Sequence, residues 1–128
     1  MSIMVGPITS GACTGADGSG AATGTSSVPV CGFVYAVYVQ YVGDDPATTD
    51  VTVKTQGTSP RAPSYNILVA TDLATDKLFL PRGISHVGTT GVAGTTYDQL
   101  TPVDDYIQVV VAQANTDDVI NVWLFMVN

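Results

Sequence analysis

The 128 residues, of which 45% are hydrophobic and 12% are charged, suffice for one domain with its own core. Eleven Asp and no Glu stand against four Lys and Arg, which gives a formal net charge of −7. This balance excludes nucleic acid and anionic membranes as expected partners, because both are bound through clustered basic side chains.

The first segment, residues 1–27, is predicted to form an extended arm outside the domain. Its stretch GPITSGACTGADGSGAATGTSS consists almost entirely of Gly, Ala, Ser and Thr, which cannot build a core alone. No basic n-region or long apolar run is present, so no secretory signal is expected. We expect the arm to pair with a strand edge of a neighbouring subunit, anchored by Ile3, Met4, Val5 and Ile8.

Cys13 and Cys31 allow one disulfide at most. Their spacing is neither that of a CxxC redox motif nor that of a zinc knuckle. In a reducing cytoplasm, isolated cysteines are more often free and buried. The sequence therefore favours two free thiols, with a disulfide between Cys13 and Cys31 as the alternative.

Residues 28–128 are predicted to form a single β-sandwich domain that begins with a long strand at Val28–Val42. Tyr35, Val37 and Val39 share one side of this strand, and the other side is also largely apolar. Apolar residues on both sides predict a central strand that is covered on both faces.

Shorter strands separated by turn residues follow. Clean alternation in DVTVKTQG predicts a strand whose Val51 and Val53 face the core. Further strands are expected at Tyr65–Leu73, Asp76–Gly83, Tyr106–Gln113 and Val119–Val127, with a long Gly- and Thr-rich loop at Ile84–Val103. No window carries a convincing helical period. The sequence thus predicts an all-β fold, an antiparallel β-sandwich or jelly-roll-like barrel of about six to eight strands.

A catalytic site is not expected. His86 is the only histidine and follows Ser85, but no G-x-S-x-G motif is present, and adjacent side chains on extended backbone point apart. Nothing marks Cys13 as a low-pKa thiol that could act with His86. A glycosidase pair would need one carboxyl with a raised pKa, whereas nearly all Asp residues lie at predicted, solvated turns. The chain is therefore predicted to be non-enzymatic.

Metal and cofactor sites are not expected either. Three acidic pairs lie at predicted turns, namely Asp44–Asp45, Asp104–Asp105 and Asp117–Asp118, and a Gly-rich loop surrounds Asp17. None has the D-x-D-x-D-G spacing or the bidentate Glu of a calcium loop, and the Gly-rich loop lacks the Lys of a phosphate cradle. These carboxylates are interpreted as turn caps that keep the surface soluble, with calcium at a turn as the open alternative.

Two stretches of the chain resemble one class of virion protein. TDVTVKTQGTSPRAPSYNILVATDLATDKLFLPRG, followed by a histidine, and the closing DDYIQVVVAQANTDDVINVWLFMVN are similar to the capsid decoration, or cement, proteins of tailed bacteriophages. The resemblance covers about residues 35–128. It implies a β-domain without an active site that binds and stabilises the outer capsid shell, with the major capsid protein as partner. It also implies a homo-oligomer, a trimer rather than a dimer, on the capsid surface after synthesis in the host cytoplasm.

A second contact with the capsid or with neighbouring copies is expected in the long loop, at His86 and Tyr97. Most other aromatic residues are expected to pack in the core. One alternative is a head–tail connector or tail structural protein, although the interface helix and charged lumen of such rings are missing. Another is a carbohydrate-binding β-sandwich of a phage fibre, which needs exposed Trp or Tyr beside Asp or Asn. Trp123, in an apolar strand, speaks against that alternative.

Overall fold

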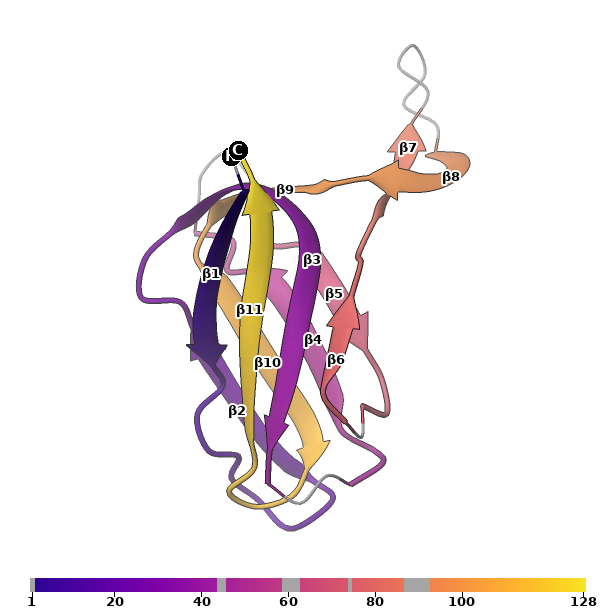
Figure 1. The fold of residues 1–128 in the computed structure, drawn as a ribbon. Coiled ribbons are helices and arrows are strands. Elements are labelled where there is room, and N and C mark those ends of the chain that lie inside the picture. The colour runs from indigo at the N-terminus through magenta and orange to yellow at the C-terminus, as the bar shows by residue number, and fades with distance from the viewer. Residues whose placement is uncertain (1, 44–45, 59–62, 74, 87–92) are drawn as a thin grey trace.

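The computed structural model describes residues 2–43, 46–58, 63–73, 75–86 and 93–128. Within these ranges the chain forms strands and no helix, and two antiparallel sheets pack face to face (Figure 1). The predicted all-β sandwich is therefore confirmed. Among the described residues, no helix has the length and apolar character needed to cross a membrane.

The front sheet faces the viewer in Figure 1 and has the strand order β1–β11–β3–β6, with β9 also paired to β3. Its strands are β1 (Ser2–Thr9), β11 (Val119–Val127), β3 (Val30–Val42), β6 (Lys77–Phe79) and β9 (Thr101–Asp105). The back sheet has the order β2–β10–β4–β5. Its strands are β2 (Gly20–Thr25), β10 (Ile107–Ala114), β4 (Asp50–Thr55) and β5 (Asn66–Ala70).

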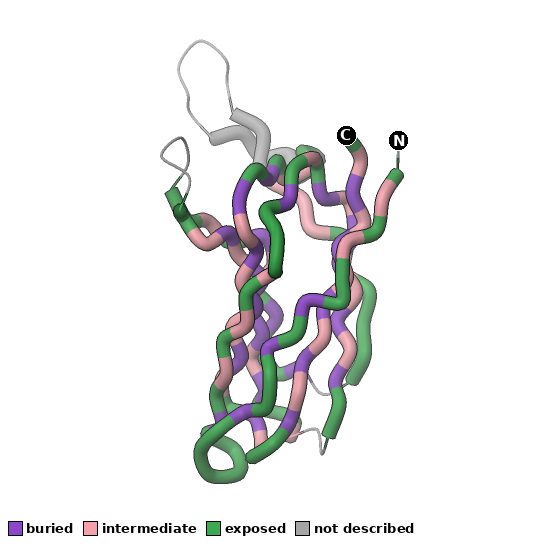
Figure 2. Tube along the Cα trace, turned by 90° about the vertical axis from the view of Figure 1, so that its left-hand side faces the viewer, coloured by how far each residue is buried: buried purple, intermediate pink, exposed green. Residues whose placement is uncertain are grey.

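The core lies between the two sheets, where the inward side chains of both are withdrawn from water. Val37, Val39 and Leu124 of the front sheet meet Val51 and Val53 of the back sheet in one cluster, and all five are fully buried. Buried and more exposed residues alternate along the strands, as the two-residue period of a strand requires (Figure 2). The inward direction of Val51 and Val53 is as predicted.

The N-terminal 27 residues differ from the expected arm. β1 pairs with β11 from Ser2 opposite Val127 to Thr9 opposite Asn121, and β2 pairs with β10. Both are edge strands of the chain's own sheets, one in each sheet. The small residues serve close packing between them, because a Cβ at Gly24 would collide with the carbonyl oxygen of Thr9.

The long strand β3 is central in its sheet but is not covered on both faces, which corrects the sequence expectation. The back sheet covers its inner face, while on its outer side Phe33 and Val42 are exposed and Tyr38 is half-buried. An irregularity in the pairing with β11 falls at Tyr35. Because of this β-bulge, Tyr35 leaves the side of Val37 and joins the outer face.

The predicted long loop contains regular structure. β6 and β9 both pair with the edge of β3 that β11 leaves free, so together they form one interrupted edge strand. The chain leaves this edge at Phe79, opposite Val37, and returns at Thr101, opposite Val34. Between these points it forms the antiparallel hairpin of β7 (Gly83–His86) and β8 (Ala93–Gln99), which projects from the sandwich (Figure 1).

The turn between β10 and β11 is held by one buried carboxylate. Asp118 accepts hydrogen bonds from the hydroxyl of Tyr41 at 2.5 Å and from the backbone N–H of Asn115 at 3.0 Å. The hydroxyl of Thr49 lies 2.9 Å from that of Tyr41. Asp117 adopts a φ of 67°, a conformation that Asp tolerates in turns. The carboxylate of Asp118 therefore caps this turn and ties it to β3.

Candidate binding face

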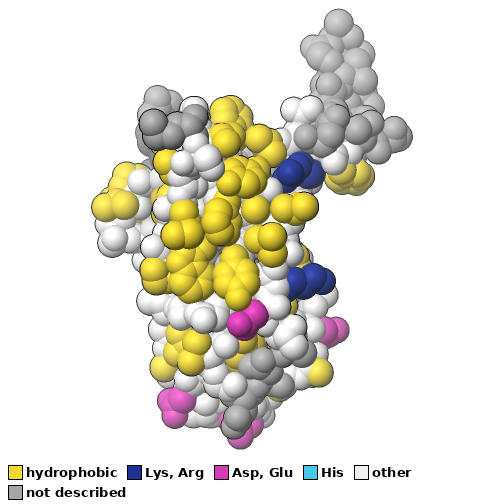
Figure 3. Space-filling view, in the orientation of Figure 1, with side chains coloured by type: hydrophobic (Ala, Val, Ile, Leu, Met, Phe, Trp, Pro, Cys, Tyr) yellow, Lys and Arg dark blue, Asp and Glu magenta, His cyan; other side chains and the backbone are white. Residues whose placement is uncertain are grey.

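The outer side of the front sheet carries exposed large apolar side chains next to half-buried aromatic rings. We call this surface the aromatic face; it consists of Met4, Phe33, Tyr35, Tyr38, Leu78, Trp123 and Phe125. Figure 3 shows hydrophobic side chains gathered over β1, β11 and β3 in the same view. Strand alternation directs these side chains outward, but it does not require them to be apolar.

Two aromatic pairs form the centre of the aromatic face. Trp123 and Tyr38 are opposite each other in the β11–β3 ladder, and their ring centroids lie 5.7 Å apart. The rings of Tyr35 and Phe125 lie 6.3 Å apart. Both pairs are tilted, at 39° and 50°, which is a favourable geometry for aromatic contacts. The rings at the centre of the aromatic face therefore contact one another within the chain.

A glycine on the edge strand positions the tryptophan. Gly6 adopts a φ of 143° where β1 bulges away from regular pairing with β11. A Cβ there would lie 2.7 Å from the carbonyl oxygen of Val122 and 3.0 Å from Cδ1 of Trp123. Only glycine permits this close approach of the β1 backbone to the indole.

Polar groups border the aromatic face at one end. Asn121 and Gln40 are opposite each other two residues along the ladder from the Trp123–Tyr38 pair, with Nδ2 and Oε1 3.4 Å apart. The carboxylate of Asp76 accepts hydrogen bonds from the backbone N–H of Tyr41 at 2.8 Å and from the hydroxyl of Tyr38 at 3.5 Å. Much of the hydrogen-bonding capacity at this border is thus already used within the chain.

The four residues predicted to anchor an N-terminal arm differ in burial. Ile8 belongs to the core, and Ile3 and Val5 are partly buried against it. Met4 faces outward and is 61% exposed, so it lies on the aromatic face. Of these four anchors, only Met4 presents a largely exposed side chain, because alternate residues of a strand point to opposite sides.

The second predicted contact lies on the projecting hairpin. Tyr97 is on β8 and is 68% exposed, so its side chain is accessible as expected for a contact residue. His86 lies on β7 opposite Ala93, and its side chain is outside the described part of the structure, as is that of Ser85. Tyr97 and Met4 belong to different parts of the molecule and do not form one site.

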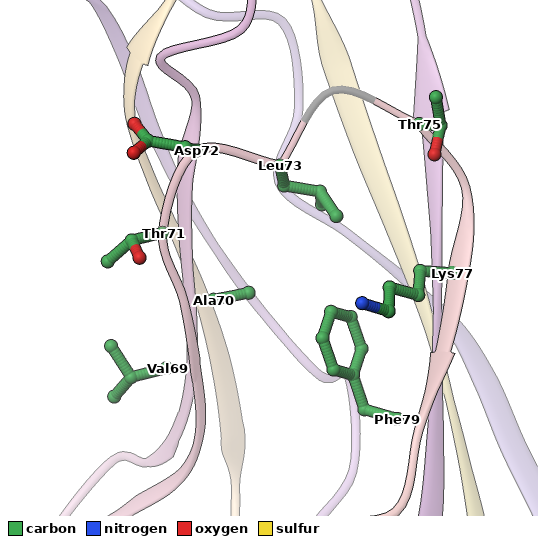
Figure 4. Close-up of a pocket in the computed structure, with 8 residues that line it drawn as sticks. All are labelled: Val69, Ala70, Thr71, Asp72, Leu73, Thr75, Lys77 and Phe79. Carbon is green, nitrogen blue, oxygen red and sulfur yellow. The ribbon is translucent and has the colours of Figure 1, made fainter.

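A groove of about 420 Å³ opens between β5 and β6 on one side of the sandwich. Figure 4 shows Ala70, Leu73 and Phe79 directed into it, with the ammonium group of Lys77 lying 5.3 Å from the Phe79 ring centroid. Asp72 also lines the groove, but its carboxylate points away from the space. The groove is open and lacks convergent polar groups, so it has no catalytic arrangement.

A second groove, of about 380 Å³, opens on the opposite side of the sandwich. We call it the β1–β2 groove. Its described lining comes from β1 and from the end of β2 with the following connection, Val5–Thr9 and Thr25–Val28, and none of these residues is charged. Val28, at its rim, is 60% exposed.

Within the acidic pair Asp104–Asp105, the carboxylate of Asp105 stabilises the fold. The carboxylate of Asp105 accepts hydrogen bonds from the Thr58 hydroxyl at 2.5 Å and from the backbone N–H groups of Gly57 and Tyr106, both at 2.7 Å. These bonds, the one from Thr58 first, hold the pKa of Asp105 below its ordinary value although burial opposes them. The carboxylate therefore fastens the connection after β4 to the junction of β9 and β10.

Both cysteines are free thiols, as the sequence favoured. Cys13 is fully buried, and burial, followed by the nearby Asp118 carboxylate, raises the pKa of its thiol. Cys31 is exposed on β3. Among the described residues, no group of three or more His, Cys, Asp or Glu side chains is placed to hold a metal ion.

No protein-family model and no curated protein matches the chain. Similar solved structures include the CBM32 of AlyQ in complex with 4,5-unsaturated mannuronic acid, at 14% identity and a TM-score of 0.43, covering 87% of this chain and 74% of that chain. The family 32 CBM from C. perfringens NanJ in complex with galactose has 8% identity and a TM-score of 0.46, with 84% and 66% covered. FLHE has 14% identity and a TM-score of 0.39, with 99% and 93% covered. At these values, the likenesses assign neither a ligand nor a partner to this chain.

Proposed function

We propose that this protein is non-enzymatic and acts by laying the aromatic face on the surface of another protein. The observation that carries the proposal is the apolar outer side of the front sheet, where Met4 at 61%, Leu78 at 55% and Phe33 at 48% exposure adjoin two aromatic pairs. A contiguous apolar surface on a folded domain is favourable when another surface covers it. Aromatic residues and Met are also the types that are enriched at the centres of protein interfaces.

The partner class that we favour is the capsid shell of a tailed bacteriophage, to which this chain would bind as a decoration protein. The resemblance of residues 35–128 to such proteins supports this choice. The low charge of the chain supports it too, since little desolvation of charge opposes burial against a protein lattice. Many copies on one lattice would bind with high avidity even if each single contact were weak.

Carbohydrate binding is the second candidate, and one observation favours it. Trp123 and Tyr38 lie side by side on the outer face, and the amides of Gln40 and Asn121 follow two residues along the ladder. Trp123, which the sequence argument set against this candidate because it lies in an apolar strand, is half-buried on the outer side of the front sheet. An aromatic platform with neighbouring polar groups suits a sugar ring, which has an apolar face and peripheral hydroxyls. We rank this candidate second because the aromatic face also extends over Met4, Phe33 and Leu78, well beyond one sugar-sized platform.

The two candidates are separated by binding assays on the same variants. The double variant Trp123→Ser with Tyr38→Ser removes the centre of the aromatic face. The matched control is Val110→Ser with Val69→Ser, whose side chains lie on the outer side of the back sheet. Under the first candidate, the front variant no longer co-sediments with empty heads of the phage that encodes the chain, and the control variant does. A glycan array that retains the wild-type chain but not the front variant would favour the second candidate instead.

A further inference from the structure

We propose that the hairpin β7–β8 is an arm that lies in the β1–β2 groove of a second copy of this chain. The proposal concerns contacts between copies, and it holds whether the aromatic face covers a protein shell or a sugar. It replaces the expected N-terminal arm, whose residues are paired within the chain's own sheets.

The arm is an insertion that the sandwich does not need. Phe79 pairs with Val37 and Thr101 pairs with Val34, so two residues would suffice to continue the edge strand past Tyr35 and Ala36. The chain instead makes an excursion at residues 80–100. A guanidinium nitrogen of Arg82 donates to the carbonyl oxygen of Tyr35 at 2.8 Å, which fills the gap in the ladder that the excursion leaves.

The arm has little support from its own domain. In the described part of the chain, β7 and β8 form a two-stranded sheet of their own and pair with no strand of the front or back sheet. A two-stranded hairpin is at best marginally stable in water by itself. Contact with another surface would stabilise it, and the exposed ring of Tyr97 offers an anchor for that contact.

Charge points to a second copy as the occupant of the groove. Two chains of net charge −7 repel each other, so the surfaces that meet should carry as little negative charge as possible. Residues 83–99 include one acidic residue, Asp98, and no Lys or Arg. The described lining of the β1–β2 groove is uncharged throughout. The β5–β6 groove, in contrast, contains the charged Lys77.

The positions of arm and groove favour a head-to-tail contact. The arm leaves from the β6 edge of the front sheet, whereas β1 and β2 are the edge strands on the other side (Figure 1). Figure 2 views the molecule from this β1–β2 side. Copies joined head to tail in this way form a ring if the rotation that relates one copy to the next returns to the first copy after a whole number of copies. A strand of the arm could also pair with the edge of β1 that faces away from β11.

Sedimentation of the full chain over a wide concentration range tests the contact with a matched pair of variants. Val28→Asp places a charge at the rim of the β1–β2 groove, and Val69→Asp places the same charge at a site of similar exposure, 56% against 60%, on β5. We expect Val28→Asp to weaken self-association by about tenfold or more, because a desolvated, unpaired carboxylate opposes the contact. Val69→Asp should associate like the wild type. A monomeric wild type, or equal weakening in both variants, would overturn the proposal.

Removal of the arm gives a second test that does not depend on charge. Deleting residues 81–99 joins Leu80 to Leu100 and closes the edge strand opposite Tyr35 and Ala36. This variant should keep its cooperative unfolding transition and sediment as a monomer. Self-association equal to that of the wild type would contradict the proposal. If the deletion does not fold, crosslinking decides: in a Cys31→Ser background, Tyr97→Cys and Val28→Cys chains should form mixed disulfides with each other. Crosslinks only between identical variants would overturn the inference.

Discussion

The two outer faces of this sandwich differ in chemistry although the same strand pattern builds both. The outer side of the front sheet presents Tyr38, Trp123 and Phe125, whereas that of the back sheet has no such rings and mixes Thr52, Lys54 and Gln108 with Val69 and Val110. Thr and Lys side chains are stable in contact with water, whereas removing aromatic rings from water lowers the free energy. Folding requires only the inner faces to be apolar. The apolar outer face is therefore the side on which to look for function.

The largest expected effect is a difference in stability between substitutions on the inner side and on the outer side of β11. Leu124 is fully buried, and its neighbour Phe125 lies on the aromatic face. We expect Leu124→Ala to lower the free energy of unfolding by about 2–5 kcal/mol, because it leaves a cavity in the core. Phe125→Ala should lower it by only about 1 kcal/mol. Urea unfolding of both variants measures the difference, and equal losses would mean that the outer face also holds the fold together.

A smaller effect is expected at the glycine that positions the tryptophan. Gly6→Ala forces a Cβ to 2.7 Å from the Val122 carbonyl oxygen at a φ of 143°. We expect a loss of about 1–3 kcal/mol in unfolding free energy together with a changed Trp123 fluorescence spectrum. The control Gly18→Ala, at a positive φ with open space around it, should leave the spectrum unchanged. An unaltered spectrum in Gly6→Ala would show that β1 does not set the indole position.

The acid dependence of stability reports on Asp105, which lies away from the aromatic face. Because the folded state lowers the pKa of Asp105, its contribution to stability is present above its ordinary pKa of 3.8 and is lost as the pH falls through the lowered value. Asp105→Asn should remove that part of the acid destabilisation. Thermal midpoints measured from about pH 5 to about pH 2 test this expectation. A variant that loses as much stability on acidification as the wild type would contradict it.

The smallest expected effect is a change in the rate at which the two cysteine thiols are labelled. Cys31 is exposed on β3, and Cys13 is buried with a raised pKa, so a maleimide should label Cys31 at once and Cys13 only after unfolding. Mass spectrometry of intact protein distinguishes the two products. Since Cys31 lies two residues from Phe33, a partner on the aromatic face should slow its labelling. Rapid labelling of Cys13 in the folded protein would show that the core opens around it.

The sequence predicted the elements of this fold better than it predicted which sides of them are exposed. Val119–Val127 is a strand with the predicted bounds, because its apolar run is long and ends at clear turn residues. The pairing of residues 2–9 with β11 could not be predicted, because it depends on backbone contacts between distant segments and on small residues that carry no hydrophobic pattern. The expected strand at Asp76–Gly83 shortens to Lys77–Phe79, because the chain leaves the sheet for the arm.

One signal for the aromatic face was present in the sequence. Asn121 lies an even number of residues from Trp123 and Phe125, so the three share one side of β11. In the same way, Gln40 shares one side of β3 with Tyr38. A polar residue marks the side of a strand that faces water, so these two amides indicated the outward direction of the rings. The outward turn of Tyr35 had no such signal, since it arises from a β-bulge against β11.

Binding to phage heads tests the central claim most directly. Under the proposed function the chain is encoded by a tailed phage, so wild-type chain, the Trp123→Ser and Tyr38→Ser double variant, and the Val110→Ser and Val69→Ser double variant are each sedimented with empty heads of that phage. The proposed function predicts that the front variant loses about 30-fold or more in affinity, as expected when central aromatic contacts are removed, while the back variant binds like the wild type. Equal binding by all three proteins, or no binding by the wild type, would contradict the account.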